Sequence, residues 1–201
     1  IIEILKKTDS RKFNPYQMYS SEILFSGKPK GLWSPKIYFK NKDILILGPG
    51  KSVINKKSLI EKLIKDNNLI VLAINTTSQL EENLINMRVV CHPMRIVSDS
   101  IFHKNSRKGL ITPFSMMPTK IQNLVNNKNK MIYDFGITIN SNEQIIVNDK
   151  YCSTPKPLAI SYALSVAISG KARRIYLAGF DGFEKSDPFK DETNEILKLI
   201  K

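Results

Sequence analysis

The chain has 201 residues, of which 42% are hydrophobic and 24% are charged; this balance suits one folded domain and excludes a disordered or collagen-like protein. Lysine and arginine number 31 against 18 aspartate and glutamate residues, so the formal net charge is +13 and an anionic partner must be considered. No apolar run approaches the roughly 20 residues that a membrane span requires.

The basic residues are scattered along the chain, and neither a nucleic-acid-binding module nor an interleaved aromatic pattern accompanies them. This argues against DNA or RNA as the partner. Cys91 and Cys152 lie far apart and form no metal-binding spacing, so we expect free thiols, no metal site and a cytoplasmic location. The chain starts at Ile1 without a secretory signal and stops at Lys201 inside a helical pattern, which predicts a fragment of a longer protein.

Residues 1–40 are predicted to be a linker with the remnant of an upstream domain. Two glycines and two prolines fall within residues 27–35, so this stretch cannot continue a helix. Trp33, the only tryptophan, is expected to dock onto a neighbouring core rather than to bind a ligand. Residues 41–201 are predicted to form a Rossmann-like nucleotide-binding domain.

From residue 43 the pattern alternates between short apolar runs and helical segments. Strands are predicted at residues 43–47, 69–74, 87–91, 110–113, 131–134 and 174–178, with a small extra strand at 145–147. Helices are predicted at residues 55–65, after Pro118, at 157–169 with Gly170 as C-terminal cap, and from 192 onward. This alternation predicts an α/β fold with a doubly wound, mostly parallel sheet.

The first glycine-rich loop, residues 48–52, directly follows the first predicted strand. Glycines allow a ligand to approach the backbone, and a helix N-terminus favours an anion. The spacing matches neither the dinucleotide fingerprint nor the P-loop. The pattern predicts phosphate or nucleotide contact through Gly48, Pro49, Gly50, Lys51 and Ser52; the alternative is a tight turn in which the glycines serve geometry alone.

Polar residues also follow the second and third predicted strands. Asn75 is expected either to hold a ribose or base, or to cap a helix. His92 is a candidate general base and Arg95 a candidate anion ligand, with a structural histidine as the alternative. His103, on a predicted surface helix, has the weaker claim to function.

Two further loops complete the set. Ser153 and Thr154 precede the apolar helix and could orient a phosphate or cap that helix. Gly179 and Asp181 follow the last strand, where the aspartate could bind a ribose hydroxyl or a metal, or only form a turn. Because no carboxylate pair, serine triad or zinc set emerges, the catalytic residues stay unassigned, with His92, Arg95 and Asp181 as candidates.

Three segments carry a resemblance to a known family: ILILGPGKSV (residues 44–53), LAIN (72–75) and PLAISYALSVAISGKARRIYLAGFDGF (157–183). They resemble the C-terminal domain attached to HMG-CoA-lyase-like aldolase barrels of bacterial surface-polysaccharide clusters. Residues 26–35 resemble the linker of those proteins. The resemblance implies an upstream aldolase barrel with lyase chemistry in the same chain, and a role in bacterial lipopolysaccharide or capsule biosynthesis.

More distantly, the same landmarks are similar to the bacterial sialyltransferases that use CMP-activated nonulosonic acids. The matching positions are Gly48, Pro49, Gly50, Ser52, Asn75, Ser153, Thr154, Gly179 and Asp181. This similarity implies a CMP-like nucleotide as ligand. The chain departs from that family in its loop order, GPGKS instead of GNGPS, and in having no histidine beyond His103, where the family carries a catalytic one in a lid. A pterin diphosphokinase family shares the style of the first loop, which leaves pyrophosphoryl transfer open.

The sequence therefore predicts a nucleotide- or nucleotide-sugar-binding domain of polysaccharide assembly, either a glycosyltransferase-like enzyme or a binding domain without catalysis. The alternative is a non-catalytic docking or oligomerisation domain of the aldolase, which includes a homo-oligomer.

Overall fold

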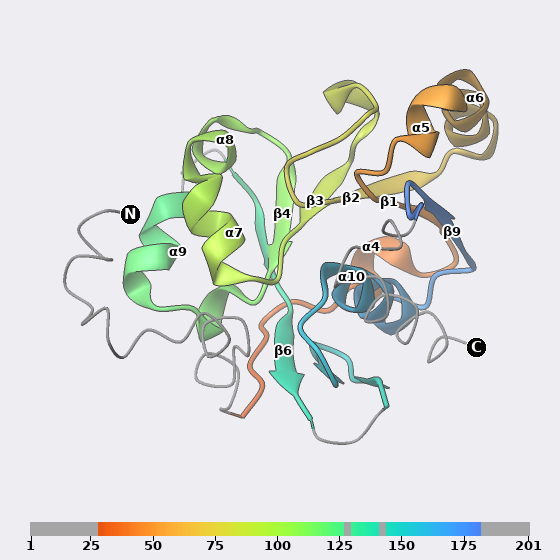
Figure 1. Cartoon of the computed structure of the whole chain (residues 1–201). Coiled ribbons are helices and arrows are strands. Elements are labelled where there is room, and N and C mark those ends of the chain that lie inside the picture. The colour runs from red at the N-terminus through yellow and green to blue at the C-terminus, as the bar shows by residue number, and fades with distance from the viewer. Residues whose placement is uncertain (1–27, 127–129, 141–143, 182–201) are drawn as a thin grey trace.

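Six strands form one parallel sheet in the order β5-β4-β3-β2-β1-β9 (Figure 1). The computed structural model describes residues 28–126, 130–140 and 144–181; the expected upstream remnant and the expected last helix lie outside these residues. All six predicted strands are confirmed to within two residues. The strands are β1 (Asp43–Leu47), β2 (Ile70–Ile74), β3 (Met87–Val89), β4 (Gly109–Thr112), β5 (Ile132–Asp134) and β9 (Arg174–Ala178).

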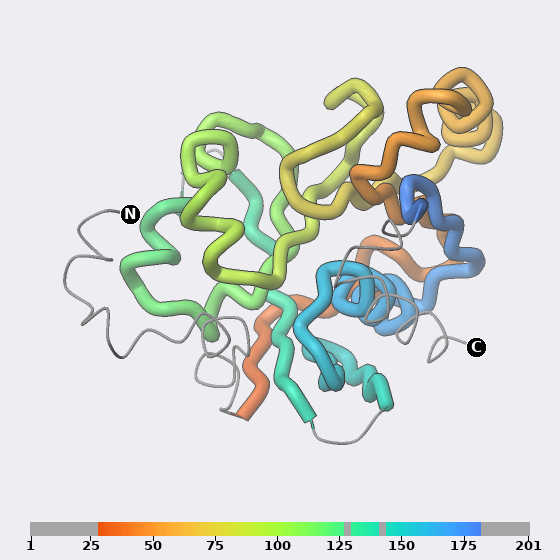
Figure 2. The backbone as a smooth tube through the Cα atoms, in the orientation of Figure 1, coloured from red at the N-terminus to blue at the C-terminus, as the bar shows by residue number. Residues whose placement is uncertain are grey.

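Helices cover both faces of this sheet, which confirms the predicted doubly wound α/β fold. Figure 2 shows α5 and α6 at one end of the molecule and α7 to α9 at the other. None of the helices in the described ranges is long and apolar enough to cross a membrane. The helices are α4 (Lys36–Phe39), α5 (Ser52–Asn55), α6 (Lys57–Asn67), α7 (Pro93–Ser98), α8 (Ser100–Asn105), α9 (Thr119–Val125) and α10 (Ala159–Ser169), with 3₁₀ turns η2 (Glu82–Leu84) and η3 (Phe114–Met116).

The central strand β1 shows why two helical layers are needed. All five of its residues are buried, and successive side chains of a strand point to opposite faces. Leu45 and Leu47 pack in one cluster with the apolar side of α6. Ile44 and Ile46 pack in another cluster with α10. A continuous apolar strand therefore sits between helices, as its sequence predicts.

The predicted apolar helix is α10, and it is buried along most of its length. Gly170 is its C-cap residue, and Pro118 directly precedes α9, so both predicted helix boundaries are confirmed. The helix predicted at residues 55–65 is confirmed as α6, with both ends two residues later. The short helix α5 precedes it and was not predicted; the two are separated at Lys56, which leaves helical geometry with φ −119° and ψ 19°.

A second, three-stranded sheet was not predicted as a whole. It consists of β6 (Gly136–Ile139), β7 (Ile146–Val147) and β8 (Tyr151–Thr154), in the order β6-β8-β7. Only β7 corresponds to a predicted strand. Strand β8 holds two small hydroxyl residues next to a proline-containing segment, so its composition resembles a loop. Pairing with β6 and packing against α10 make it a strand.

The linker joins the sheet domain through aromatic side chains. The Trp33 ring lies 4.8 Å from the ring of Tyr133 and 5.8 Å from that of Phe39, measured between centroids. Phe39 of α4 is fully buried in the core. The prediction that Trp33 docks onto a neighbouring core is therefore confirmed.

The predicted surface position of His103 is wrong. The helix exists as α8, but the His103 side chain is fully buried. The ammonium group of Lys130 donates to the carbonyl oxygen of His103 at 2.7 Å. The sequence could not reveal this burial, because Lys130 belongs to the segment before β5 rather than to α8.

Candidate functional site at the sheet rim

The site lies where the strand order reverses. The chain builds the sheet outward from β1 to β5 and then returns to place β9 on the other side of β1. In open parallel sheets, ligands bind beyond the carboxyl ends of the strands at such a switch point. Residues 48–52 follow β1 and residues 179–181 follow β9. We call these two segments, together with Asn75 and Gln79, the rim site.

Backbone contacts hold the two glycine-containing segments together. The Gly48 amide donates to Ala178 O at 2.8 Å, and the Gly50 amide donates to Gly179 O at 3.0 Å. A Cβ atom on Gly50 would lie 2.6 Å from Gly179 O, closer than real Cβ atoms approach. Gly179 also has a φ of +75°, which a glycine adopts without strain. The glycines therefore allow two backbones to touch.

Asp181 occupies the position in which the sequence predicts a phosphate. Its Oδ2 accepts from the Ser52 amide at 2.7 Å, and its Oδ1 accepts from the Ser52 hydroxyl. Hydrogen bonds from the Ser52 hydroxyl and then its amide hold the pKa of Asp181 below its ordinary value, so the carboxylate is ionised at neutral pH. The prediction of open amides in this turn is corrected: the Gly48 amide is bonded to the last residue of β9, and the amides of residues 50 and 52 are bonded to the segment after it.

Asn75 reaches the rim in an unusual backbone conformation. Its φ is +57°, in the left-handed region that asparagine tolerates better than most residues. Its amide donates to Val89 O at 3.0 Å. The expected helix cap is wrong, because residues 75–81 form a loop before η2. Among the described residues, no hydrogen bond uses the side-chain amide of Asn75, which leaves it available to a ligand.

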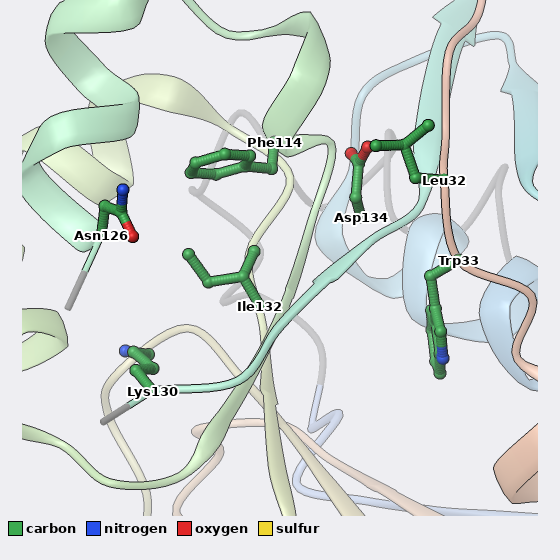
Figure 3. Close-up of a pocket in the computed structure, with 7 residues that line it drawn as sticks. All are labelled: Leu32, Trp33, Phe114, Asn126, Lys130, Ile132 and Asp134. Carbon is green, nitrogen blue, oxygen red and sulfur yellow. The ribbon is translucent and has the colours of Figure 1, made fainter. Parts of the chain in front are cut away.

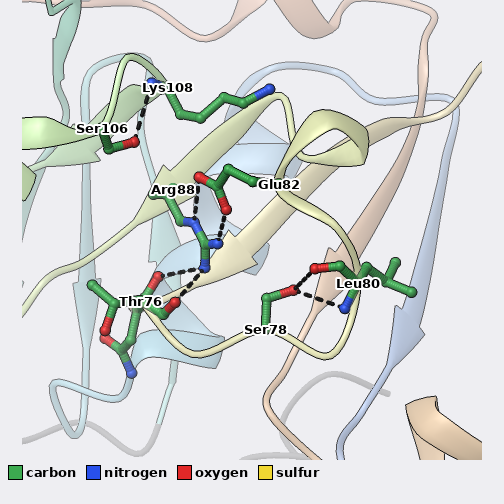
Figure 4. A network of polar contacts seen from close by, with 8 residues as sticks. Thr76, Ser78, Leu80, Glu82, Arg88, Ser106 and Lys108 are labelled. Atoms are coloured by element: carbon green, nitrogen blue, oxygen red, sulfur yellow. Dashed lines mark hydrogen bonds and ion pairs between the residues drawn. The ribbon is translucent and has the colours of Figure 1, made fainter. Parts of the chain in front are cut away.

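Arg88 holds this loop through hydrogen bonds to its backbone (Figure 4). One nitrogen, Nη1, donates to Asn75 O at 3.1 Å and to Thr76 O at 3.0 Å. The rest of the guanidinium pairs with the carboxylate of Glu82, and its carbon lies 5.3 Å from the ring centroid of Phe102. Sequence reasoning missed this residue. One sequence feature could have identified it: Arg88 lies between apolar residues in a predicted buried strand. A buried charge needs hydrogen-bond or ion-pair partners, so such an arginine indicates a polar network nearby.

Gln79 links the same loop to the first turn. Its Nε2 donates to the carbonyl oxygen of Pro49 at 3.4 Å. The loop after β2 thus contacts the loop after β1, which in turn contacts the segment after β9. Three of the predicted loops converge, and Gln79 is a further member that the sequence did not single out.

His92 and Arg95 lie after β3, at the start of α7. The Nδ1 atom of His92 accepts from the Met94 amide at 3.2 Å, so this side chain caps α7. Burial, and then the positive charge of Arg95, lower the pKa of His92, which favours the neutral imidazole. Arg95 is exposed within α7. The hydrogen bond through which His92 caps α7 therefore supports the interpretation of His92 as a structural histidine.

Ser153 and Thr154 are buried within β8. The Ser153 hydroxyl accepts from Asn140 Nδ2 at 2.7 Å, and the Thr154 hydroxyl donates to Lys156 O at 2.9 Å. Neither residue caps α10, whose N-cap position is Leu158 without a side-chain hydrogen bond. The capping alternative is therefore wrong, and these hydroxyls serve their own sheet and the following turn.

The cysteines are not placed for nucleophilic chemistry. Cys91 and Cys152 are both free and buried, and burial raises the pKa of each thiol to about 12. Within the described ranges, no three histidine, cysteine, aspartate or glutamate residues gather as a metal site. The chemistry of the rim site thus rests on the ionised carboxylate of Asp181, on the side-chain amide of Asn75, which has no hydrogen bond among the described residues, and on the exposed Lys51.

Comparisons with protein-family models, with curated proteins and with solved structures found no match to this chain.

Proposed function

We propose that this chain binds a nucleotide or nucleotide sugar at the rim site. The observation that supports this most is the convergence of three loops at the switch point of a doubly wound sheet, the general location of ligand sites in this architecture. The net charge of +13 favours an anionic ligand. The resemblance described above adds a CMP-like nucleotide and a transferase role in polysaccharide assembly to the proposal.

In this proposal the ligand contacts side chains rather than the turn amides. Asp181 is ionised and held by Ser52, so it accepts hydrogen bonds from ribose hydroxyls. Lys51 is exposed on the same turn and supplies a positive charge for a phosphate group. Asn75 offers an amide donor and acceptor for the base or the ribose.

Calorimetric titration with CMP, CDP and UDP tests the proposal. We expect saturable binding of at least one of them, weakened roughly tenfold by Asp181→Ala and by Asn75→Ala, because each change removes a hydrogen bond to the ligand. Asn41→Ala is the matched control. Asn41 also has a positive φ, of 60°, but it precedes β1 and so lies at the opposite edge of the sheet.

Two results would contradict this arrangement. The absence of heat and of any thermal stabilisation with all three nucleotides would exclude the rim site as a nucleotide site. Tighter binding by Asp181→Ala would mean that the phosphate competes with the carboxylate for Ser52, and the assigned role of Asp181 would then be wrong.

A further inference from the structure

Basic side chains gather at the amino ends of β1 and β9, the edge of the sheet opposite the rim site. Two segments far apart in the sequence meet there. The Asn41 amide donates to Lys171 O at 3.1 Å, and the Arg173 amide donates to Lys42 O at 2.8 Å. We call the five exposed basic residues of these segments the basic patch: Lys40, Lys42, Lys171, Arg173 and Arg174.

The basic patch has a large excess of positive charge. Among the described residues, the only carboxylate that forms ion pairs with it is that of Asp43, which is 4% exposed. Arg173 donates to both oxygens of this carboxylate at 2.8 Å, and Arg174 lies 3.9 Å from it. The other three basic residues form no ion pair within the described part of the chain: Lys40, Lys42 and Lys171. One buried carboxylate thus faces five cations, and three of these are available to an anionic partner.

The availability of these lysines contrasts with that of the lysine in the pocket of about 380 Å³ beside β5 (Figure 3). That residue, Lys130, is buried, and its ammonium group donates to His103 O at 2.7 Å. Its charge is therefore committed to the interior of the protein. The charges of the basic patch instead face solvent, so they can contact a partner too large to enter a pocket.

Two exposed isoleucines border the basic patch. Ile37 on α4 is 77% exposed, and Ile168 in the last turn of α10 is 46% exposed. The two helices lie against each other, since a Cβ atom on Gly170 would lie only 2.7 Å from the Cβ atom of Phe39 (Figure 1). Aliphatic side chains therefore lie at the margin of a cationic surface, a composition typical of proteins that bind to the surface of a membrane.

We propose that the basic patch binds the surface of an anionic phospholipid bilayer. The lysine and arginine side chains contact the lipid phosphates, and Ile37 enters the headgroup region. The exposed isoleucines favour a bilayer over a nucleic acid, because a sugar-phosphate backbone has no apolar layer to receive them. The inference does not depend on the nucleotide proposal, since the rim site lies at the other edge of the sheet.

Sedimentation of the full chain with lipid vesicles tests the proposal. We expect binding to phosphatidylcholine vesicles that contain phosphatidylglycerol at about 30%, and no binding to phosphatidylcholine alone. Raising NaCl from about 0.1 M to about 0.5 M should release the protein, because salt screens the attraction. Equal binding to both kinds of vesicle, or no binding to the anionic ones, would overturn the proposal.

Paired variants locate the binding face. Lys40→Gln combined with Lys171→Gln removes two charges of the basic patch and should weaken vesicle binding roughly tenfold or more. Lys62→Gln combined with Lys120→Gln removes the same charge from exposed positions on α6 and α9, and should weaken binding less than about threefold. Equal losses in the two double variants would mean attraction by net charge alone and would refute the basic patch.

Ile37→Ser separates a bilayer from other polyanions. This change keeps every charge and should weaken vesicle binding roughly fivefold, because it removes an apolar side chain that enters the headgroup region. Lys62→Ser, an exposed change away from the basic patch, is the control for the introduced serine and should lose less affinity than Ile37→Ser. Unchanged vesicle binding by Ile37→Ser would instead identify the basic patch as a general site for polyanions such as nucleic acid, and the bilayer would be the wrong partner.

Discussion

Buried ionisable side chains gather near α8 and the segment before β5. Arg88, His103 and Lys130 are each at most 9% exposed. Arg88 and Lys130 find hydrogen-bond acceptors, but neither ring nitrogen of His103 has a partner among the described residues. Burial, and then the nearby charge of Lys130, lower the pKa of His103 to about 4. The imidazole is therefore neutral in the folded protein at neutral pH.

This burial predicts a specific acid sensitivity. Because the folded state lowers the pKa of His103 from 6.5 to about 4, protonation favours the unfolded chain. The free energy of unfolding should be unaffected by this group above about pH 6.5, fall between pH 6.5 and 4, and lose up to about 3 kcal/mol in total.

Urea unfolding of the wild type and of His103→Leu across this pH range measures the effect. The leucine variant should lack this part of the pH dependence, while the carboxylate contributions common to both proteins cancel in the difference. Parallel pH profiles for wild type and His103→Leu would contradict a buried neutral imidazole.

At the scale of elements, the ends of β1 and β9 are joined more tightly than ordinary neighbouring strands. The backbone bonds of the ladder continue past both strands into the loops, through Gly48 and Gly50. The short helix α5 begins directly at Ser52, which binds Asp181. The rim site is therefore organised by a close backbone approach that only glycine permits.

Gly179→Ala tests this approach. Alanine would have to adopt a φ of +75°, and its Cβ would collide with the backbone of Gly48. We expect a loss of at least about 2 kcal/mol in the free energy of unfolding. Lys171→Gly is the inverse control: Lys171 is exposed with a φ of 56°, so glycine there should change stability by no more than about 1 kcal/mol. A neutral Gly179→Ala would disprove the close approach.

On the scale of the whole molecule, the linker is part of the folded unit. The rings of Trp33, Tyr38 and Tyr133 form one aromatic group, with Trp33 also set edge-on against Phe39. Gly31 and Gly136 let the linker backbone pass close to the junction of β5 and β6. These contacts join residues that precede β1 to the far edge strand of the sheet.

Trp33→Ala should therefore destabilise the entire domain. A half-buried tryptophan with three aromatic neighbours predicts a loss of about 2 kcal/mol in the free energy of unfolding. Leu32→Ala at the adjacent position is the control, because Leu32 is 78% exposed and its removal should change stability by less than about 0.5 kcal/mol. Urea unfolding followed by circular dichroism measures both. Equal effects of the two variants would contradict the docking of the linker.

The sequence by itself determined the elements of the main sheet. Short apolar runs ending at glycine or asparagine located β1 and β2, because a strand buried on both faces must be continuously apolar. A similar run located β9, although this edge strand is partly exposed. The apolar composition of α10 likewise required a buried helix. The residues at strand ends also predicted which loops meet at the rim, since parallel strands bring their carboxyl ends to one edge.

Only the tertiary structure decided what those residues do. Asp181 lies 129 positions from Ser52 in the chain, and no local pattern could indicate that its carboxylate takes the amide predicted for a phosphate. The same holds for Arg88, which donates to the backbone of Asn75, for the buried His103 and for β8, whose strand state depends on β6 and α10. Hydrophobic periodicity can be recognised within a short stretch of sequence. The hydrogen-bond partner of a polar group cannot, because it depends on which distant segment packs against that group.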